Sequence, residues 1–152
     1  MIETVVLAVS STDDRRQKRL AETAADVVDD GGTVVVFHAF DADRYDELLD
    51  QLNMSPDAEG AADALAERHG VAASVADHLD GAGVDVVVRG AVGDESDSIL
   101  DVSEAVAADM VVIGGRKRSP SGKALFGSTA QTVLLEADCP VTFVKERAGE
   151  GE

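Results

Sequence analysis

The chain has 152 residues, of which 45% are hydrophobic, so it is long enough for one domain and too apolar to be disordered. Its 30 acidic and 13 basic residues give a net charge of −17, which disfavours nucleic acid and anionic membranes as partners. The acids are scattered along the chain, as expected of a uniformly solvated surface in a salt-loving source, where ions screen the repulsion. No apolar run has the length of a membrane span, no signal-peptide pattern is present, and the single Cys139 allows no internal disulfide, so a cytoplasmic location is expected.

Short apolar runs rich in β-branched residues predict five buried strands. They are Thr4–Val9, Thr33–Phe40, Val84–Val88, Met110–Ile113 and Val141–Val144. Helical patterns lie between them, over residues 13–29, 55–79 with a break near Gly70, 93–107 and 130–137. The acidic segment 41–55 is expected to be a loop with at most one turn of helix.

This alternation of strands and helices predicts an α/β fold, an open parallel sheet with helices on both faces. Residues 1–145 are expected to form a single domain, and residues 146–152 a polar tail. Ligands of such sheets bind beyond the carboxyl ends of the strands, where the strand order reverses.

One loop at that edge, Gly114–Thr129, combines glycines with positive charge in an otherwise acidic chain. Its glycines allow close approach of a ligand, and Gly127-Ser128-Thr129 lies where a helix begins and where free N–H groups suit an anion. The basic residues are Arg116, Lys117, Arg118 and Lys123. Two interpretations remain open from spacing alone: a phosphate-binding cradle, or a solvated loop with a serine N-cap.

Three better-known phosphate motifs do not fit. A P-loop would need glycine at position 117 and Ser or Thr at position 124, where this chain has Lys117 and Ala124. The first turn after a strand, Ser10-Ser11-Thr12, has no glycine, so the dinucleotide fingerprint is absent. A phosphorylated receiver domain would need an Asp at the end of the third strand, where the sequence reads Arg89-Gly90.

The candidate catalytic residues form no recognisable set. His38, His69 and His78 lack metal-ligand spacing, so no metal site is expected. His38 is interpreted as a structural histidine at the end of a strand, and the other two as solvent-facing. Cys139 has no visible partner for nucleophilic chemistry. We therefore expect no catalytic residues and at most slow hydrolysis of ATP.

Three regions together resemble the universal stress protein family: Val5–Val9, Gly93–Ile113 and above all Gly114–Val144. The last is similar to the family's G-x2-G-x9-G-[ST] signature, followed by a helix and a Cys-Pro-Val strand. The resemblance implies strand order 3-2-1-4-5 and a homodimer paired through Val141–Val144. It also implies, for the members that bind nucleotides, ATP or a related adenine nucleotide held by the backbone of the glycine loop.

The signature can be carried over residue by residue. Gly114 is its first glycine, Gly127-Ser128 its closing pair, with Thr129 next, and Ala39, after His38, is the position that meets adenine. Two positions depart from the pattern, because Lys117 replaces the second glycine and Ser10 replaces the usual Asp after the first strand. The expected binding residues are therefore Ser10, Ala39, Gly114, Arg116, Lys117, Gly127, Ser128 and Thr129.

The departures leave three hypotheses open. The first is a stress-response module that binds an adenine nucleotide. The second is an interaction protein without a nucleotide, whose loop holds at most an inorganic anion; Lys117 and Ser10 motivate it. The third, an enzyme acting on a phosphorylated small molecule, is permitted by the basic loop but supported by no acid–base pair.

Overall fold

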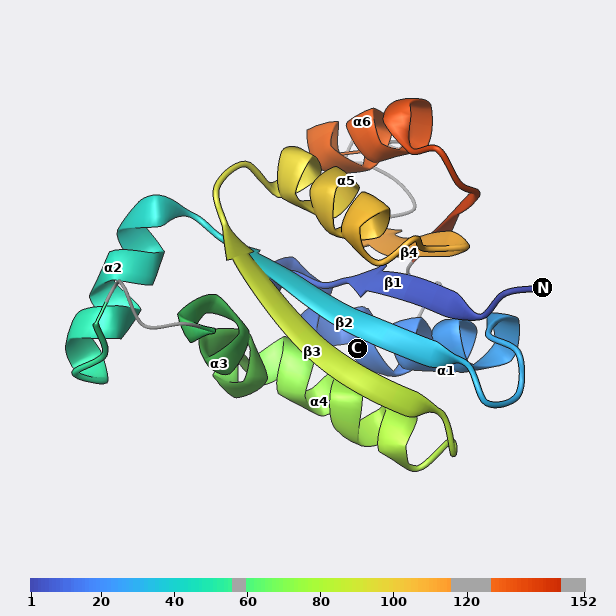
Figure 1. Cartoon of the computed structure of the whole chain (residues 1–152), viewed down its shortest axis with the longest axis horizontal. Helices are drawn as coiled ribbons and strands as arrows, with labels where there is room; N and C mark the ends of the chain where they lie inside the picture. Colours follow the sequence, from blue (N-terminus) through green and yellow to red (C-terminus); the bar gives the residue numbers. More distant parts are fainter. Residues whose placement is uncertain (56–59, 116–126, 146–152) are drawn as a thin grey trace.

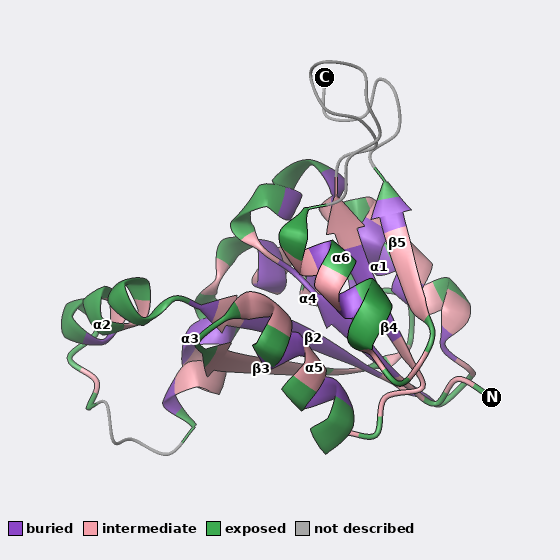
Figure 2. Ribbon diagram, turned by 90° about the horizontal axis from the view of Figure 1, so that it is seen from above, coloured by how far each residue is buried: buried purple, intermediate pink, exposed green. Residues whose placement is uncertain are grey.

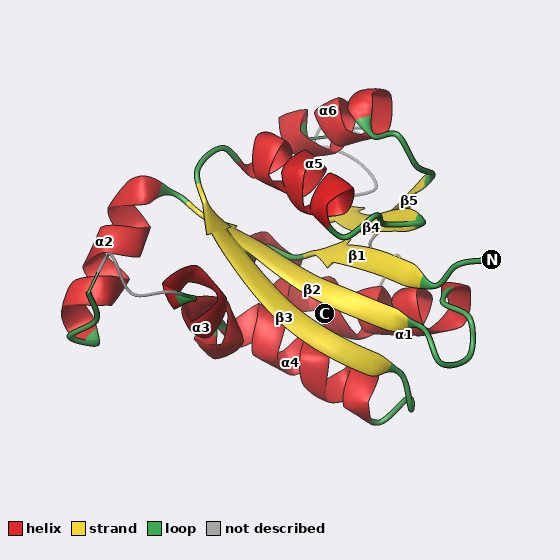
Figure 3. Ribbon diagram, viewed as in Figure 1, coloured by secondary structure: helices red, strands yellow, loops and turns green. Residues whose placement is uncertain are grey.

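A computed structural model describes residues 1–55, 60–115 and 127–145, and it contains a five-stranded parallel sheet of order β3-β2-β1-β4-β5. The predicted fold class and strand order are therefore confirmed (Figures 1 and 3). The strands are β1 Thr4–Ala8, β2 Thr33–Phe40, β3 Asp85–Val92, β4 Met110–Gly115 and β5 Val141–Lys145.

Helices cover both faces of this sheet. The 3-10 helix η1 Ser11–Arg16 leads into α1 Gln17–Val27, and the later helices are α2 Ala42–Gln51, α3 Ala61–Arg68, α4 Gly70–Asp80, α5 Glu95–Ala105 and α6 Ser128–Glu136. In Figure 1, α5 and α6 lie on one side of the sheet and α1, α3 and α4 on the other. Among the described residues, no helix is both long and apolar enough to cross a bilayer.

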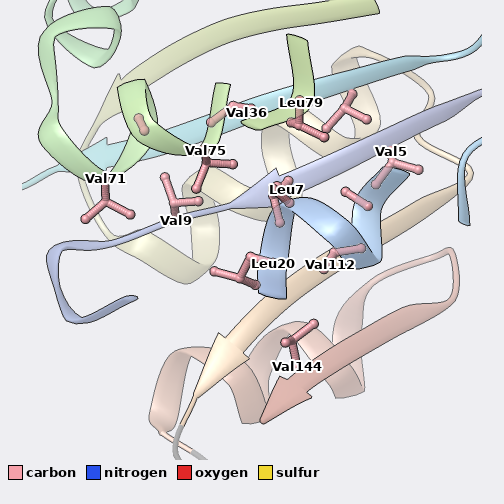
Figure 4. Packing of buried hydrophobic residues seen from close by; sticks show 14 of the residues in the cluster. Val5, Leu7, Val9, Leu20, Val36, Val71, Val75, Leu79, Val112 and Val144 are labelled. Carbon is pink, nitrogen blue, oxygen red and sulfur yellow. The ribbon is translucent and has the colours of Figure 1, made fainter. Parts of the chain in front are cut away.

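Alternate residues of each central strand supply the two cores, which explains why these strands are apolar without interruption. On the side of α1 and α4, Val5, Leu7 and Val9 pack against Leu20 and Val75 (Figure 4). On the side of α5 and α6, the core contains Val6, Ala8, Val35, Phe37, Ile99, Val102, Val111, Ile113, Ala130 and Val133. Figure 2 shows the resulting contrast between the buried central strands and the exposed outer surfaces of the helices.

The segment after β2 was wrongly expected to be a loop, because it forms the ten-residue helix α2. Asp41 caps this helix, its carboxylate accepting the N–H of Arg44 at 2.8 Å. Leu49 is its one buried residue and joins a small separate core with Phe40 and Leu65. Tyr45, Leu48, Leu49 and Leu52 do recur at helical spacing, and Tyr45 and Leu48 pack partly buried against this core, but the expectation of a loop gave more weight to the acidic residues around them.

Strand β3 is longer than predicted and runs past Val88 to Val92, in register with β2. Gly90 makes this possible, because a Cβ atom there would collide with the carbonyl of Ala62 in α3. The expected break between α3 and α4 occurs at His69, next to Gly70. The other helices lie where they were predicted, with bounds that differ by a few residues.

Candidate functional site

The ends of β1, β2 and β4 bring three of the predicted site residues to one edge of the sheet. β1 pairs with β2 on one side and with β4 on the other, so the strand order reverses between β1 and β4. Ser10 lies just after β1, while Ala39 and Gly114 are the second-to-last residues of β2 and β4. Because α6 packs back over β4 and β5, its first residues also lie at this edge.

Ser10 does not present a free hydroxyl here. Its Oγ lies 2.7 Å from Thr12 Oγ1 and donates to Asp13 Oδ2 at 3.4 Å, while its backbone N–H donates to the same Asp13 oxygen at 2.8 Å. The serine therefore organises the start of η1, and because its proton goes to Asp13, its hydroxyl can only accept a further hydrogen bond from a ligand.

Beneath this turn lies a buried ion pair that the sequence reasoning missed. Arg16 Nε lies 2.6 Å from Asp13 Oδ1, each side chain is only 5% exposed, and Arg16 Nη2 donates to the carbonyl of Thr12 at 3.1 Å. The only sequence signal was the spacing of an acid three residues before a base. Asp13 is thus an acid near the end of β1, but its two oxygens are occupied by Arg16 and Ser10.

The ion pair explains Gly114. A Cβ atom at this position would lie 2.9 Å from both Arg16 Nε and Asp13 Oδ1, so only glycine fits against the pair. Gly115 has a comparable reason, because a Cβ atom there would meet the ring of Phe143 at 2.6 Å. The expectation that these glycines serve ligand approach is therefore not needed to explain either of them.

Gly127 is different, because neither its backbone nor its packing requires glycine. Its φ is −62°, which any residue adopts, and no described atom lies within 4 Å of a Cβ built there. It is the N-cap of α6 and provides no side-chain cap. A glycine in this position leaves space beside the first N–H groups of the helix.

The first turn of α6 is well suited to an anion. Ser128 is exposed, Thr129 is half-buried, and the turn contains no acidic residue. By contrast, Asp41 and Asp94 cap α2 and α5 with their own carboxylates. The N–H groups and the dipole of α6 are thus left for an external acceptor by the described part of the chain. The predicted cations Arg116 and Lys117 lie outside the described residues.

Small side chains line the edge next to β2. Ala39 is half-buried and pairs in register with Ala91 of β3, and both side chains lie on the face covered by α5 and α6. Ala39 thus lies on the β2 side of the reversal, whereas Gly114 and the start of α6 lie on the β4 side. The geometry brings the two groups of predicted residues to opposite ends of one edge.

Two histidines lie together on the opposite face. The rings of His38 and His69 stack with centroids 3.8 Å apart and an angle of 19° between their planes. His38 Nδ1 donates to the carbonyl of Val9 at 2.9 Å, which is the structural role predicted for it. The prediction of a solvent-facing His69 is wrong, because this residue is half-buried at the junction of α3 and α4.

The environment of His69 keeps its ring neutral. Burial, and then the proximity of His38, lower the pKa of His69 from 6.5 to about 4. Its Nδ1 accepts the N–H of Ala72 at 3.3 Å, so the ring proton lies on Nε2, which donates to Ser11 Oγ at 3.2 Å. His69 thereby caps α4 and ties it to η1.

No group of three or more His, Cys, Asp or Glu residues suited to a metal ion occurs within residues 1–55, 60–115 and 127–145. His78 is exposed on α4. Cys139 is half-buried before β5, and burial raises the pKa of its thiol, which disfavours the reactive thiolate.

The sequence of this chain is similar to that of known proteins. Residues 1–145 match the model of the universal stress protein family. A universal stress protein of Mycolicibacterium smegmatis is 37% identical over 116 residues, which cover 75% of this chain and 88% of that protein.

Solved structures of universal stress proteins have a similar fold. A universal stress protein from Archaeoglobus fulgidus aligns with a TM-score of 0.66 and 28% identity, covering 95% of this chain and 100% of the other. An Archaeoglobus fulgidus universal stress protein in complex with dAMP aligns with a TM-score of 0.61 and 24% identity, again over 95% of this chain and all of the other.

Proposed function

Because the chain belongs to the universal stress protein family, we propose that it is a stress-response module that binds ATP or a related adenine nucleotide at the carboxyl edge of its sheet. The observation that carries the proposal is the N-terminus of α6, where Gly127 is required neither by its backbone conformation nor by packing against any described residue. Universal stress proteins of the same fold have been solved with dAMP, cAMP and AMP, which supports an adenine nucleotide as the ligand.

The phosphates of the nucleotide would lie at the first N–H groups of α6, over Gly127, Ser128 and Thr129. Its base would extend across the end of β1 towards Ala39. Arg116 and Lys117 are the cations that we expect to approach the phosphates. No metal is assigned to the site.

We propose further that the protein works without catalytic turnover, or with slow hydrolysis at most. The acid that follows β1, Asp13, is held in its ion pair with Arg16 and is a poor candidate for a general base.

We also propose that the protein is a cytoplasmic homodimer paired through Val141–Val144, since β5 is an edge strand of the sheet and no strand of the described residues pairs with its outer side. The high-salt origin suggested by the net charge belongs to the same proposal.

A melting experiment tests the nucleotide site. Millimolar ATP should raise the melting temperature of the wild-type protein, by roughly 5–10 °C if the nucleotide reaches about 100 times its dissociation constant. Gly127→Val should abolish the rise, because the side chain fills the space beside the helix N-terminus while meeting no described atom.

Gly70→Val is the matched control. Gly70 also begins a helix, is exposed, and has open space around a Cβ atom, so this variant should retain the full response to ATP. A wild-type protein whose melting temperature does not respond to ATP would contradict the proposal.

A second candidate is an interaction protein whose loop holds only an inorganic anion. It is favoured by one observation, the engagement of the Ser10 hydroxyl with Thr12 and Asp13. In that case inorganic phosphate and ATP should raise the melting temperature equally, and adenosine should have no effect.

A further inference from the structure

Two serines lie buried on the inner face of α5, and within the described part of the chain only one of their hydroxyls has a hydrogen-bond partner. Ser103 is 9% exposed, and its Oγ donates to the carbonyl of Ile99 at 2.7 Å, the usual bond of a helical serine. Ser98 is 8% exposed, but its hydroxyl bonds to no group in the described part of the chain. Because the two side chains lie on the same helix and are equally buried, they differ only in whether the hydroxyl has a hydrogen-bond partner.

The usual internal partner of Ser98 is not used. Asp94 is four residues earlier, and its carbonyl accepts the backbone N–H of Ser98 at 2.9 Å, not the hydroxyl. The carboxylate of Asp94 accepts the Ser96 hydroxyl and the N–H of Asp97. The Ser98 oxygen is not fully enclosed either, since the fully enclosed atoms without a partner in the described residues are Gln17 Oε1 and Arg19 Nε.

Ser98 lies in the first turns of α5, at the edge of the sheet that holds the candidate site. A Cβ atom on Gly93, which follows β3, would lie 3.9 Å from Ser98 Oγ. The next residue, Ile99, belongs to the core between α5 and the sheet, so Ser98 lies where that core reaches the edge. On the same face, Ala39 and Ala91 present only methyl groups.

Ser98 thus has a hydroxyl that is nearly buried, has no partner in the described part of the chain and is still reached from outside, so it can offer its hydrogen bond to a ligand. We propose that the Ser98 hydroxyl is a specificity contact that hydrogen-bonds the base of the bound nucleotide. A hydroxyl both donates and accepts, so it can match either the exocyclic amine or a ring nitrogen of adenine. This inference rests on the proposed nucleotide function.

The sheet order assigns Ser98 to the base, not to the phosphates. α5 packs over β1 and β2, which lie on the side of the reversal away from β5. The phosphate-binding end, at Gly127, belongs to α6, which packs over β4 and β5. We therefore assign the base of a nucleotide that is anchored at α6 and extends past Ser10 to the part of the edge where α5 begins.

Calorimetric titration of the full chain with AMP and with adenosine tests this contact. Ser98→Ala should weaken AMP binding about three- to tenfold, the effect of one neutral hydrogen bond. It should weaken adenosine binding by the same factor, because the contact does not involve phosphate. Ser98→Ala should melt no lower than the wild type without ligand, since it removes an unpaired hydroxyl.

Ser103→Ala is the control and should bind both ligands like the wild type. Equal AMP affinity of Ser98→Ala and the wild type would overturn the inference, as would an equal loss in Ser103→Ala or a loss confined to AMP. A wild-type protein that binds neither ligand would instead remove the proposed function, and the inference with it.

Discussion

At the scale of single residues, the glycines at the carboxyl edge of the sheet have different roles: some are required by packing, and one is available to a ligand. Gly114 is required by the buried pair of Asp13 and Arg16, whereas no atom of the described residues lies within 4 Å of a Cβ built on Gly127. The first and the closing glycine of the signature, Gly114 and Gly127, therefore have different roles. The first lets η1 pack beneath the end of β4, and the closing one leaves room at the N-terminus of α6.

The neutral state of His69 makes a prediction about pH. The pKa of His69 is about 4 in the folded chain and 6.5 in the unfolded chain, so the unfolded chain takes up the proton first as pH falls. Its contribution to stability is complete above pH 6.5 and is lost as pH falls towards 4. Because the ring is half-buried and screened by solvent, we expect a loss on the order of 1–2 kcal/mol.

Urea unfolding at a series of pH values checks this, with His69→Asn as the control. Asparagine can still accept the N–H of Ala72 but does not titrate, so the variant should lose less stability between pH 6.5 and 4 than the wild type. Parallel pH profiles of the two proteins would show that His69 is not the responsible group.

At the scale of elements, α2 is held by its cap and by one buried side chain. The carboxylate of Asp41 accepts the N–H of Arg44, and Leu49 is 3% exposed. We expect Asp41→Ala to destabilise α2 by about 1 kcal/mol and to leave the sheet unchanged. Amide hydrogen exchange should then be about fivefold faster in α2 only.

Asp46→Ala is the matched control for this helix, because Asp46 is exposed in the middle of α2 and caps nothing in the described residues. Equal exchange rates in the two variants would show that the cap does not stabilise α2.

The elements also show what could be predicted from the sequence. Strands such as Thr33–Phe40 were predicted to the residue, because a strand buried on both faces must be apolar throughout. The start of α6 at Gly127-Ser128-Thr129 was predicted from its place before a helical pattern, although the N-cap is Gly127 and not the expected serine. α2 was missed because its acidic residues outweighed the apolar spacing of Tyr45, Leu48 and Leu49, of which only Leu49 is fully buried. β3 was cut short because Arg89 and Gly90 interrupt its apolar run.

Contacts between distant parts of the chain could not be predicted. The fit of Gly114 against Asp13 and Arg16 joins β4 to η1, and the stacking of His38 on His69 joins β2 to the start of α4. Neither leaves a periodic pattern in the sequence. The unpaired hydroxyl of Ser98 is visible only when the partners of each buried group are known.

At the scale of the whole molecule, 30 acidic and 13 basic residues should make stability depend on salt. Repulsion within a net charge of −17 opposes the compact state, and salt screens it. We expect the melting temperature to rise by roughly 5–10 °C between 0.1 and 2 M KCl. Calorimetric scans across that range check this, and a melting temperature that stays constant would contradict a high-salt habitat.

On our proposal, the nucleotide extends along the carboxyl edge of the sheet, from the small side chains of Ala39 and Ala91 to the N-terminus of α6 at Gly127. The most direct test is mass spectrometry of the small molecules released from the native protein after equilibration with millimolar ATP and AMP and rapid gel filtration. The account predicts about one adenine nucleotide per chain in the wild type and none in Gly127→Val. Release of inorganic phosphate alone, or of no small molecule, by the wild type would contradict it.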